Sequence, residues 1–282
     1  MIPELQRDAL RRAFDGASAR YDSAARLQAE ARQELLARLE ILRLVPEVAL
    51  DLGAGPGSGS RALAKRYPQA KIVALDLSLR MLREARRHAG LLRKFARVAA
   101  DARAIPLRSA SVDLVFSNLL LQWCTPPDEV LAEVRRVLRP GGFFAFTTVG
   151  PQTLVELRAA WATVDSLPHV HTFIDMHDLG SALARTGFAE PVLDVDRTRR
   201  RYDDPQALMR ELKTIGAHNA ARDRRRGLMG RGRFARMLAA YPREAGQIDA
   251  TFEIIYGAAW AGQQQTPGEF AVAAQSVRRR RR

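Results

Sequence analysis

Cysteine is nearly absent from this chain, which has a single residue of this type, Cys124, among 282. One thiol cannot form an internal disulfide and argues against a structural zinc site, so we expect no metal centre and interpret Cys124 as a small buried residue. No apolar run reaches the length of a membrane span, and the opening MIPELQRDAL lacks the basic-then-apolar order of a signal peptide. We therefore expect a cytoplasmic protein with no membrane partner.

Lysine is also scarce, because 41 of the 45 basic residues are arginine. Arginine abundance can reflect genome composition, so the placement of these residues carries more information than their number. The formal net charge is +14, of which residues 197–236 contribute +9 and residues 278–282 contribute +5. A basic segment of this kind indicates an acidic partner, either nucleic acid or an acidic protein. We interpret the terminal arginine run as a solvated, disordered tail.

The stretch LDLGAGPGSG, residues 50–59, places four glycines at alternate positions after an apolar run. Glycine lets main-chain N–H groups approach a ligand closely, and a strand, a glycine loop and a helix form the first unit of a nucleotide-binding sheet. The dinucleotide pattern G-x-G-x-x-G would need glycine at Ser58 or Ser60. The pattern D-x-G-x-G instead suits a cofactor with a free ammonium group and no phosphate, which is S-adenosylmethionine. The predicted contacts are Asp51, Gly53, Gly55 and Gly57.

Two further acidic residues follow apolar runs. Asp76 closes KIVALD, and an acid about twenty residues beyond a glycine loop accepts hydrogen bonds from ribose hydroxyls. Asp101 follows FARVAA and is expected to meet the adenine amino group from a third strand end. Leu77 and Ala102, the next residues in the chain, complete the predicted adenosine contacts. The alternative for each aspartate is that it caps the N-terminus of a helix.

Strand and helix alternate from Val48 to Val149, which indicates a parallel sheet. Predicted strands lie near 48–52, 71–76, 95–100, 112–117 and 142–148, and predicted helices near 58–67, 78–89 and 126–138. Two helices are expected within residues 1–44. Later segments are predicted as helices over 153–165, 176–188 and 203–219, and as strands over 190–196 and 250–260.

The chain resembles the BioC family of class I methyltransferases, the malonyl-acyl-carrier-protein O-methyltransferases of biotin synthesis. The resemblance rests on AFDGASARYDSAARLQ (13–28), LDLGAGPG (50–57), FSNLLLQWC (116–124), FTTVGPQTLVELRAAWATVD (146–165), PHVHTF (168–173), LMRELKTIGAHN (208–219) and GLMGR (227–231). Ala54 stands where the family often has cysteine, and His171 where it usually has asparagine. These segments cover nearly the whole chain.

The resemblance implies an α/β fold of the Rossmann-like class I methyltransferase type, with a mostly parallel seven-stranded sheet. It implies a helical lid (1–44), a cofactor-binding core (45–196), a basic helical cap (197–249), a last strand returning to the core (250–270) and an arginine-rich tail (271–282). The partner would be an acidic acyl carrier protein that docks on the cap.

The implied reaction moves a sulfonium methyl group to the free carboxylate of a malonyl thioester. A carboxylate is ionised at neutral pH, so no general base is needed and catalysis reduces to alignment and desolvation. We expect Tyr21, with Arg201 or Arg231, to hold the oxygen that does not attack. Asn118 and Gln122 follow the fourth strand and are expected to face cofactor or substrate, and His169, His171 and Asn219 to line the cap side. Tyr21 could instead be a core residue, and each arginine a docking or solvated residue.

Two other functions remain open at this point. The basic cap could bind RNA, or the enzyme could methylate a small molecule; against RNA, only Tyr202 and Phe234 are aromatic within residues 197–236, too few for base stacking. Nucleic acid is therefore not the expected partner. The chain could also be related to the assembly factors of respiratory complex I, which are similar to this family and include hydroxylases and scaffolds.

Overall fold

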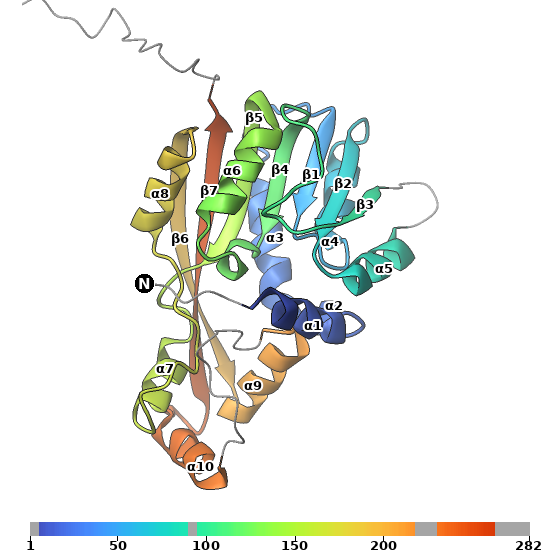
Figure 1. Ribbon diagram of the computed structural model, residues 1–282. Helices are drawn as coiled ribbons and strands as arrows, with labels where there is room; N and C mark the ends of the chain where they lie inside the picture. Colours follow the sequence, from blue (N-terminus) through green and yellow to red (C-terminus); the bar gives the residue numbers. More distant parts are fainter. Residues whose placement is uncertain (1–5, 90–94, 218–229, 263–282) are drawn as a thin grey trace, which may run out of the picture.

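The computed structural model describes residues 6–89, 95–217 and 230–262. Within these residues seven strands form one sheet in the order β3-β2-β1-β4-β5-β7-β6 (Figure 1). β7 pairs antiparallel with both of its neighbours, whereas the first five strands pair in parallel. The strands are β1 (Val48–Leu52), β2 (Lys71–Asp76), β3 (Ala96–Ala99), β4 (Val112–Asn118), β5 (Leu138–Val149), β6 (Phe188–Tyr202) and β7 (Ile248–Ala261). The expected α/β fold with a mostly parallel seven-stranded sheet is confirmed.

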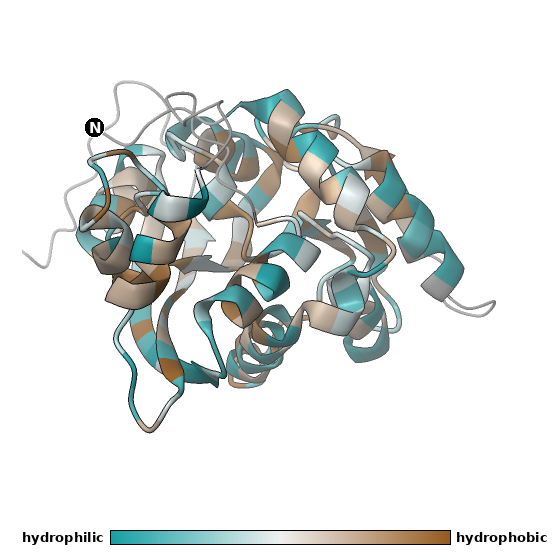
Figure 2. Ribbon diagram, turned by 90° about the horizontal axis from the view of Figure 1, so that it is seen from below, coloured by the Kyte–Doolittle hydropathy of each residue, from teal (hydrophilic) through white to brown (hydrophobic). Residues whose placement is uncertain are grey.

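Helices cover both faces of this sheet. They are α1 (Arg7–Ala17), α2 (Tyr21–Ala24), α3 (Arg26–Arg38), α4 (Ser58–Arg66), α5 (Leu79–His88), α6 (Asp128–Val137), α7 (Val155–Ala162), α8 (Met176–Arg185), α9 (Pro205–Thr214) and α10 (Arg231–Ala240). Successive side chains of a strand point to opposite faces, so Leu50 packs in the cluster that contains α6 and α8, whereas Ala49 packs in the cluster that contains α3, α4 and α5. Figure 2 shows hydrophilic and hydrophobic residues mixed along the helices, as amphipathic surface helices require.

β6 and β7 extend beyond the rest of the sheet and carry α7, α9 and α10 (Figure 1). A separate apolar cluster holds this extension together, with Trp161 of α7, Leu208 of α9 and Met237 of α10 packed against Phe252 of β7. α1 and α2 lie across the carboxyl ends of the central strands, next to this extension (Figure 1).

The most informative difference from the sequence prediction concerns β6. The extended segment was predicted over 190–196, but the strand runs from Phe188 to Tyr202 and includes the first residues of the predicted cap. β6 is an edge strand, where the exposed Arg199 and Arg201 hinder further pairing. Arg200, between them, has a side chain that is only 13% exposed and pairs with Glu30 of α3, so the arginine run follows the alternation of a strand. Asn219 and the tail 271–282 lie outside the described residues, and no helix in the described part of the chain is long and apolar enough to cross a membrane.

Candidate active site

Three adjoining pockets lie at the carboxyl ends of the central strands. The first, here called the acidic pocket, is lined by residues that include Asp76, Leu77, Asp101, Ala102 and Asn118. The glycine pocket is lined by residues that include Asp51, Gly53, Gly55, Arg32 and Gln28. The apolar pocket is lined by residues that include Phe14, Leu119, Gln122, Leu157, His169 and Phe252. Tyr21 lines all three pockets, so the spaces meet at its side chain.

The glycine loop joins β1 to α4 and has two different tasks. Gly53 and Gly55 line the pockets with positive φ angles of 77° and 52°, and a Cβ on Gly55 would meet no atom within 4 Å, which leaves its main chain open to a ligand. Gly57 lines none of the three pockets. A Cβ at Gly57 would lie 2.9 Å from the Cβ of Ala85 in α5, so this glycine permits close packing behind the loop. Gly57 therefore has a packing role, and its predicted contact with the cofactor stays a prediction.

Asp51 is 2 % exposed at the end of β1. The Ser60 hydroxyl donates a hydrogen bond of 2.6 Å to its carboxylate, and the missing side chain of Gly59 leaves room for that carboxylate. Burial, and next the nearby charge of Asp76, raise the pKa of Asp51 to about 6. A buried carboxylate with a raised pKa gains from a cationic ligand, and the ammonium group of an amino acid would be such a ligand.

Asp76 is held by the backbone of the loop that it faces. Its carboxylate accepts hydrogen bonds from the N–H groups of Gly55 at 2.8 Å and Ser78 at 2.7 Å, and burial raises its pKa. Asp101 accepts from the N–H of Arg103 at 2.9 Å and forms an ion pair of 3.0 Å with Arg7 of α1. In both cases the carboxylate is oriented toward the acidic pocket from a strand end.

None of these aspartates is the N-cap residue of a helix in the described part of the chain. The N-cap of α4 is Gly57, and the N-cap of α5 is Ser78, whose hydroxyl accepts from Met81 at 3.1 Å. The chain after β3 enters no helix before the short 3₁₀ turn at Leu121. Asp51 does accept from Ser60 in the first turn of α4, although it is not the N-cap residue. All three carboxylates stand at strand ends, which is where open α/β sheets bind ligands.

Two residues from the N-terminal helices complete the glycine pocket. Tyr21 begins α2, and burial, followed by the charge of Asp76, raises the pKa of its hydroxyl, which stays protonated at neutral pH. Arg32 of α3 lines the glycine pocket near Asp22 and Asp51, and burial lowers the pKa of its guanidinium. Arg32 can pair with an anionic group beside Asp51. Arg32 is not among the predicted contacts, because nothing in the sequence distinguishes it from the other arginines.

The two arginines predicted to contact substrate lie away from these pockets. Arg201 is on β6 with 56 % of its side chain exposed, and its Nε is 3.4 Å from a carboxylate oxygen of Asp249. Arg231 is the exposed first residue of α10. Neither lines the apolar pocket, and no arginine does among the residues that the structure describes. The structure brings Tyr21 to the pockets but not these arginines.

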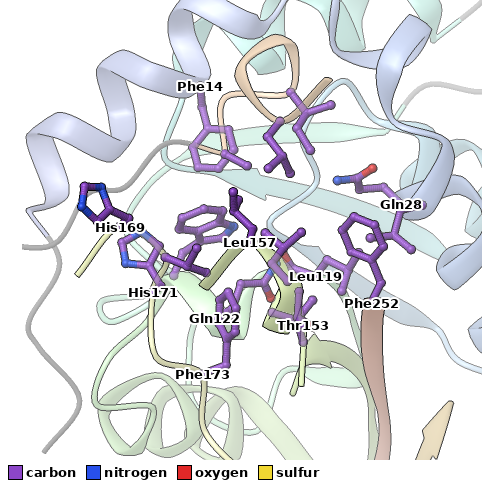
Figure 3. Close-up of a pocket in the computed structure, with 18 of the residues that line it drawn as sticks. Phe14, Gln28, Leu119, Gln122, Thr153, Leu157, His169, His171, Phe173 and Phe252 are labelled. Atoms are coloured by element: carbon purple, nitrogen blue, oxygen red, sulfur yellow. The ribbon is translucent and has the colours of Figure 1, made fainter. Parts of the chain in front are cut away.

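The polar groups of the apolar pocket are mostly engaged with the protein. Gln122 donates to the carbonyl of Leu119 at 2.8 Å and accepts from the Thr148 hydroxyl, and it lines the apolar pocket rather than the acidic one. His169 stacks on Trp161 with ring centroids 3.8 Å apart, and its Nε2 is 2.7 Å from Asp165. Figure 3 shows His169 and His171 on one side of the pocket and Gln28 on the other.

Comparison with known proteins agrees with this geometry. A family model described as a methyltransferase domain matches residues 50–146. A malonyl-acyl-carrier-protein O-methyltransferase of Laribacter hongkongensis is 49% identical over 261 residues, covering 89% of this chain and 88% of that protein. One of Halorhodospira halophila is 44% identical over 288 residues, covering 99% and 97%. The solved structure of the Bacillus subtilis YcgJ protein has a TM-score of 0.59 at 14% identity, covering 82% of this chain and 99% of that one. The chain belongs to the family of malonyl-acyl-carrier-protein O-methyltransferases.

Proposed function

We propose that this chain transfers the methyl group of S-adenosylmethionine to the free carboxylate of malonyl-acyl carrier protein. The observation that carries the proposal is the position of Tyr21, which borders the acidic, glycine and apolar pockets at once. A methyl donor that occupies the first two pockets and an acyl group in the third would meet at this side chain. The resulting methyl ester hides the malonyl charge, so that fatty-acid enzymes can elongate the product toward biotin.

The residues of the first two pockets fit the cofactor. Asp51 would hold the ammonium group of its methionine part, and Arg32 would hold the carboxylate group. A buried carboxylate and a half-buried guanidinium in one pocket suit these two opposite charges. Asp76 would accept from the ribose hydroxyls, and Asp101, with Leu77 and Ala102, would surround the adenine. The bound cofactor supplies an electrophilic methyl group on a positively charged sulfur.

The acyl carboxylate needs only to be desolvated and aligned. In the transfer, a bond forms between one carboxylate oxygen and the methyl carbon while the bond between carbon and sulfur breaks, and the electron pair of that bond stays on sulfur. No proton moves, so the protonated Tyr21 hydroxyl serves as a donor that orients the carboxylate rather than as a base. The apolar walls formed by Leu119, Leu157 and Phe252 exclude water from the reacting oxygen.

The exposed arginines of the extension suit an acidic carrier protein. Arg197, Arg199 and Arg201 of β6 and Arg231 and Arg236 of α10 are exposed, and the chain as a whole carries a net charge of +14. Complementary charge speeds the encounter of two proteins, and added salt weakens this attraction. We therefore place Arg201 and Arg231 in docking, with turnover on malonyl-acyl carrier protein falling as ionic strength rises.

A methyl-transfer assay tests the proposed function. Radiolabelled S-adenosylmethionine is offered with malonyl-acyl carrier protein, free malonyl-coenzyme A or structured RNA, and we expect label on the carrier protein as a base-labile ester. Replacing Tyr21 by phenylalanine is expected to lower kcat about tenfold, because one hydrogen bond to a charged group is lost. Tyr67→Phe, at the end of α4, is the matched control with unchanged turnover. Label on RNA, or none on the carrier, would refute the proposal.

The raised pKa of Asp51 makes cofactor binding depend on pH. Without cofactor the pKa of this carboxyl is about 6, and the ammonium group binds its ionised form, so below pH 6 binding must release a proton. We expect the dissociation constant of S-adenosylmethionine to rise about tenfold from pH 7 to pH 5, as one proton is linked to binding. Calorimetry across this range measures it, and Asp51→Asn should bind weakly with a shallower dependence on pH. A flat profile for the unaltered protein would contradict this assignment.

A further inference from the structure

Gln28 presents a buried polar group to the boundary between two pockets. The residue lies in the first turn of α3 and lines both the apolar pocket and the glycine pocket. Its side-chain oxygen is buried and has no hydrogen-bond partner among the described residues. A buried amide oxygen without a partner is unfavourable by about 1–3 kcal/mol, so its retention needs an explanation.

The backbone of Gln28 is fixed in place by the sheet edge. The Asn118 amide donates a hydrogen bond of 3.0 Å to the carbonyl of Gln28, and the Thr147 hydroxyl donates one of 2.9 Å to the side-chain oxygen of Asn118. This chain of bonds ties α3 to the ends of β4 and β5. Asn118, predicted as a cofactor contact, thus also positions Gln28. The side chain of Gln28 points into the apolar pocket from the side opposite His169 (Figure 3).

Gln122 offers a direct contrast in the same pocket. Both ends of its side-chain amide are used by the protein, one by the carbonyl of Leu119 and the other by the Thr148 hydroxyl. Gln28 has no such engagement for its oxygen. The other end of the Gln28 amide is an NH₂ group with two donors. The oxygen of Gln28 is enclosed by protein, and Figure 3 shows the amide nitrogen on the side of the other lining residues, so Gln28 can present its NH₂ group to a ligand in the pocket. Gln122 cannot do so without breaking two bonds.

We propose that Gln28 is a substrate-binding residue whose amide NH₂ donates a hydrogen bond to the non-attacking oxygen of the acyl carboxylate. The inference rests on the proposed function and names a residue that holds the substrate in it. Gln28 borders both the space for the methyl donor and the space for the acyl group, and Tyr21 is the second neutral donor at that boundary. None of the described residues that line the apolar pocket is an arginine that could bind the carboxylate.

Uncharged hydrogen-bond donors to the acyl carboxylate suit the chemistry of this transfer. The carboxylate is negative and the sulfonium positive before the reaction, and both charges disappear as the new bond forms. A guanidinium would stabilise the separated charges before reaction more than the neutral product, which would raise the barrier. Neutral donors in a water-poor pocket orient the carboxylate without this penalty, and the cofactor itself provides the countercharge.

Replacing Gln28 by leucine tests the inference in the full chain. We expect the KM for malonyl-acyl carrier protein to rise and kcat/KM to fall about 10- to 100-fold, the effect of losing one hydrogen bond to a charged group. Cofactor affinity should not change, and the melting temperature should stay or rise, because an unpartnered buried oxygen is removed. Gln28→Glu should be less active still, since two carboxylates would face each other. Gln33→Leu, an exposed position on the same helix, is the matched control.

A binding measurement separates this inference from the proposed function. With S-adenosylhomocysteine present, the unaltered protein should bind malonyl-pantetheine more tightly than its methyl ester, and Gln28→Leu should lose that preference. Absence of methyl transfer by the unaltered protein would overturn the proposed function. Unchanged kcat/KM and unchanged preference in Gln28→Leu would overturn the role of Gln28, and so would a loss of cofactor affinity equal to the loss of turnover.

Discussion

Replacing Asp76 by alanine is expected to weaken binding of S-adenosylmethionine on the order of 100-fold or more, because two interactions to a charged group are lost together. The carboxylate is the proposed acceptor for the ribose hydroxyls, and it also holds the N–H groups of Gly55 and Ser78. Its removal frees the loop that forms the floor of the glycine pocket. Calorimetric titration with cofactor measures the loss.

Asp113→Ala is the matched control for this experiment. Asp113 also accepts hydrogen bonds from two backbone N–H groups, those of Glu47 and Val48 at 2.9 Å, but at the start of β4 and therefore at the opposite edge of the sheet. We expect Asp113→Ala to lower the melting temperature while the cofactor affinity stays unchanged. An equal loss of affinity in both variants would mean that the effect of Asp76 is general destabilisation.

Among replacements of the sheet glycines by alanine, Gly257→Ala is expected to lower the stability of the protein most. Gly257 of β7 stands opposite Phe146 of β5, and a Cβ at this position would overlap the Phe146 ring. That ring is fully buried and stacks on Phe144 at 4.7 Å between centroids, so it cannot move aside. We expect a loss of about 3 kcal/mol in the free energy of unfolding and a fall in melting temperature of roughly 6–12 °C.

Differential scanning calorimetry measures this effect, and Gly232→Ala is its control. Gly232 lies near the start of α10, where an added Cβ would meet no atom within 4 Å. Alanine is favoured over glycine in helices, so this variant should be as stable as the unaltered protein or slightly more so. Equal melting temperatures for Gly257→Ala and the unaltered protein would contradict the packing described for β5 and β7.

The central strands could be predicted from the sequence because each is a buried apolar run. β1 and β2 begin and end at the predicted residues, since both faces of a central parallel strand are covered and the run ends where polar residues begin. β6 was predicted too short because its second half is a run of charged residues, of which Arg197, Arg199 and Arg201 are exposed at the sheet edge. The pattern of apolar residues thus predicts a strand well when both of its faces are buried, and predicts it less well when only one face is covered.

The proposed cofactor side of the site was also accessible to sequence reasoning, because it is built from strand ends. Asp51, Asp76 and Asp101 come from successive strands, and their positions follow from the parallel sheet. Arg32 and Gln28 come from α3, and only tertiary packing brings that helix to the sheet edge. No spacing rule connects these two residues to the glycine loop, so the structure was needed to find them.

The position of β7 between β5 and β6 has a consequence for biosynthesis. β7 follows both neighbours in the chain, so a nascent polypeptide cannot complete the sheet until residues 248–261 have left the ribosome. Until then the free edge of β5, Leu138–Val149, remains a template for pairing with other chains. Translation that stalls before Ile248 would therefore release an aggregation-prone intermediate, and the need for a chaperone should last from the synthesis of β5 until β7 pairs with it.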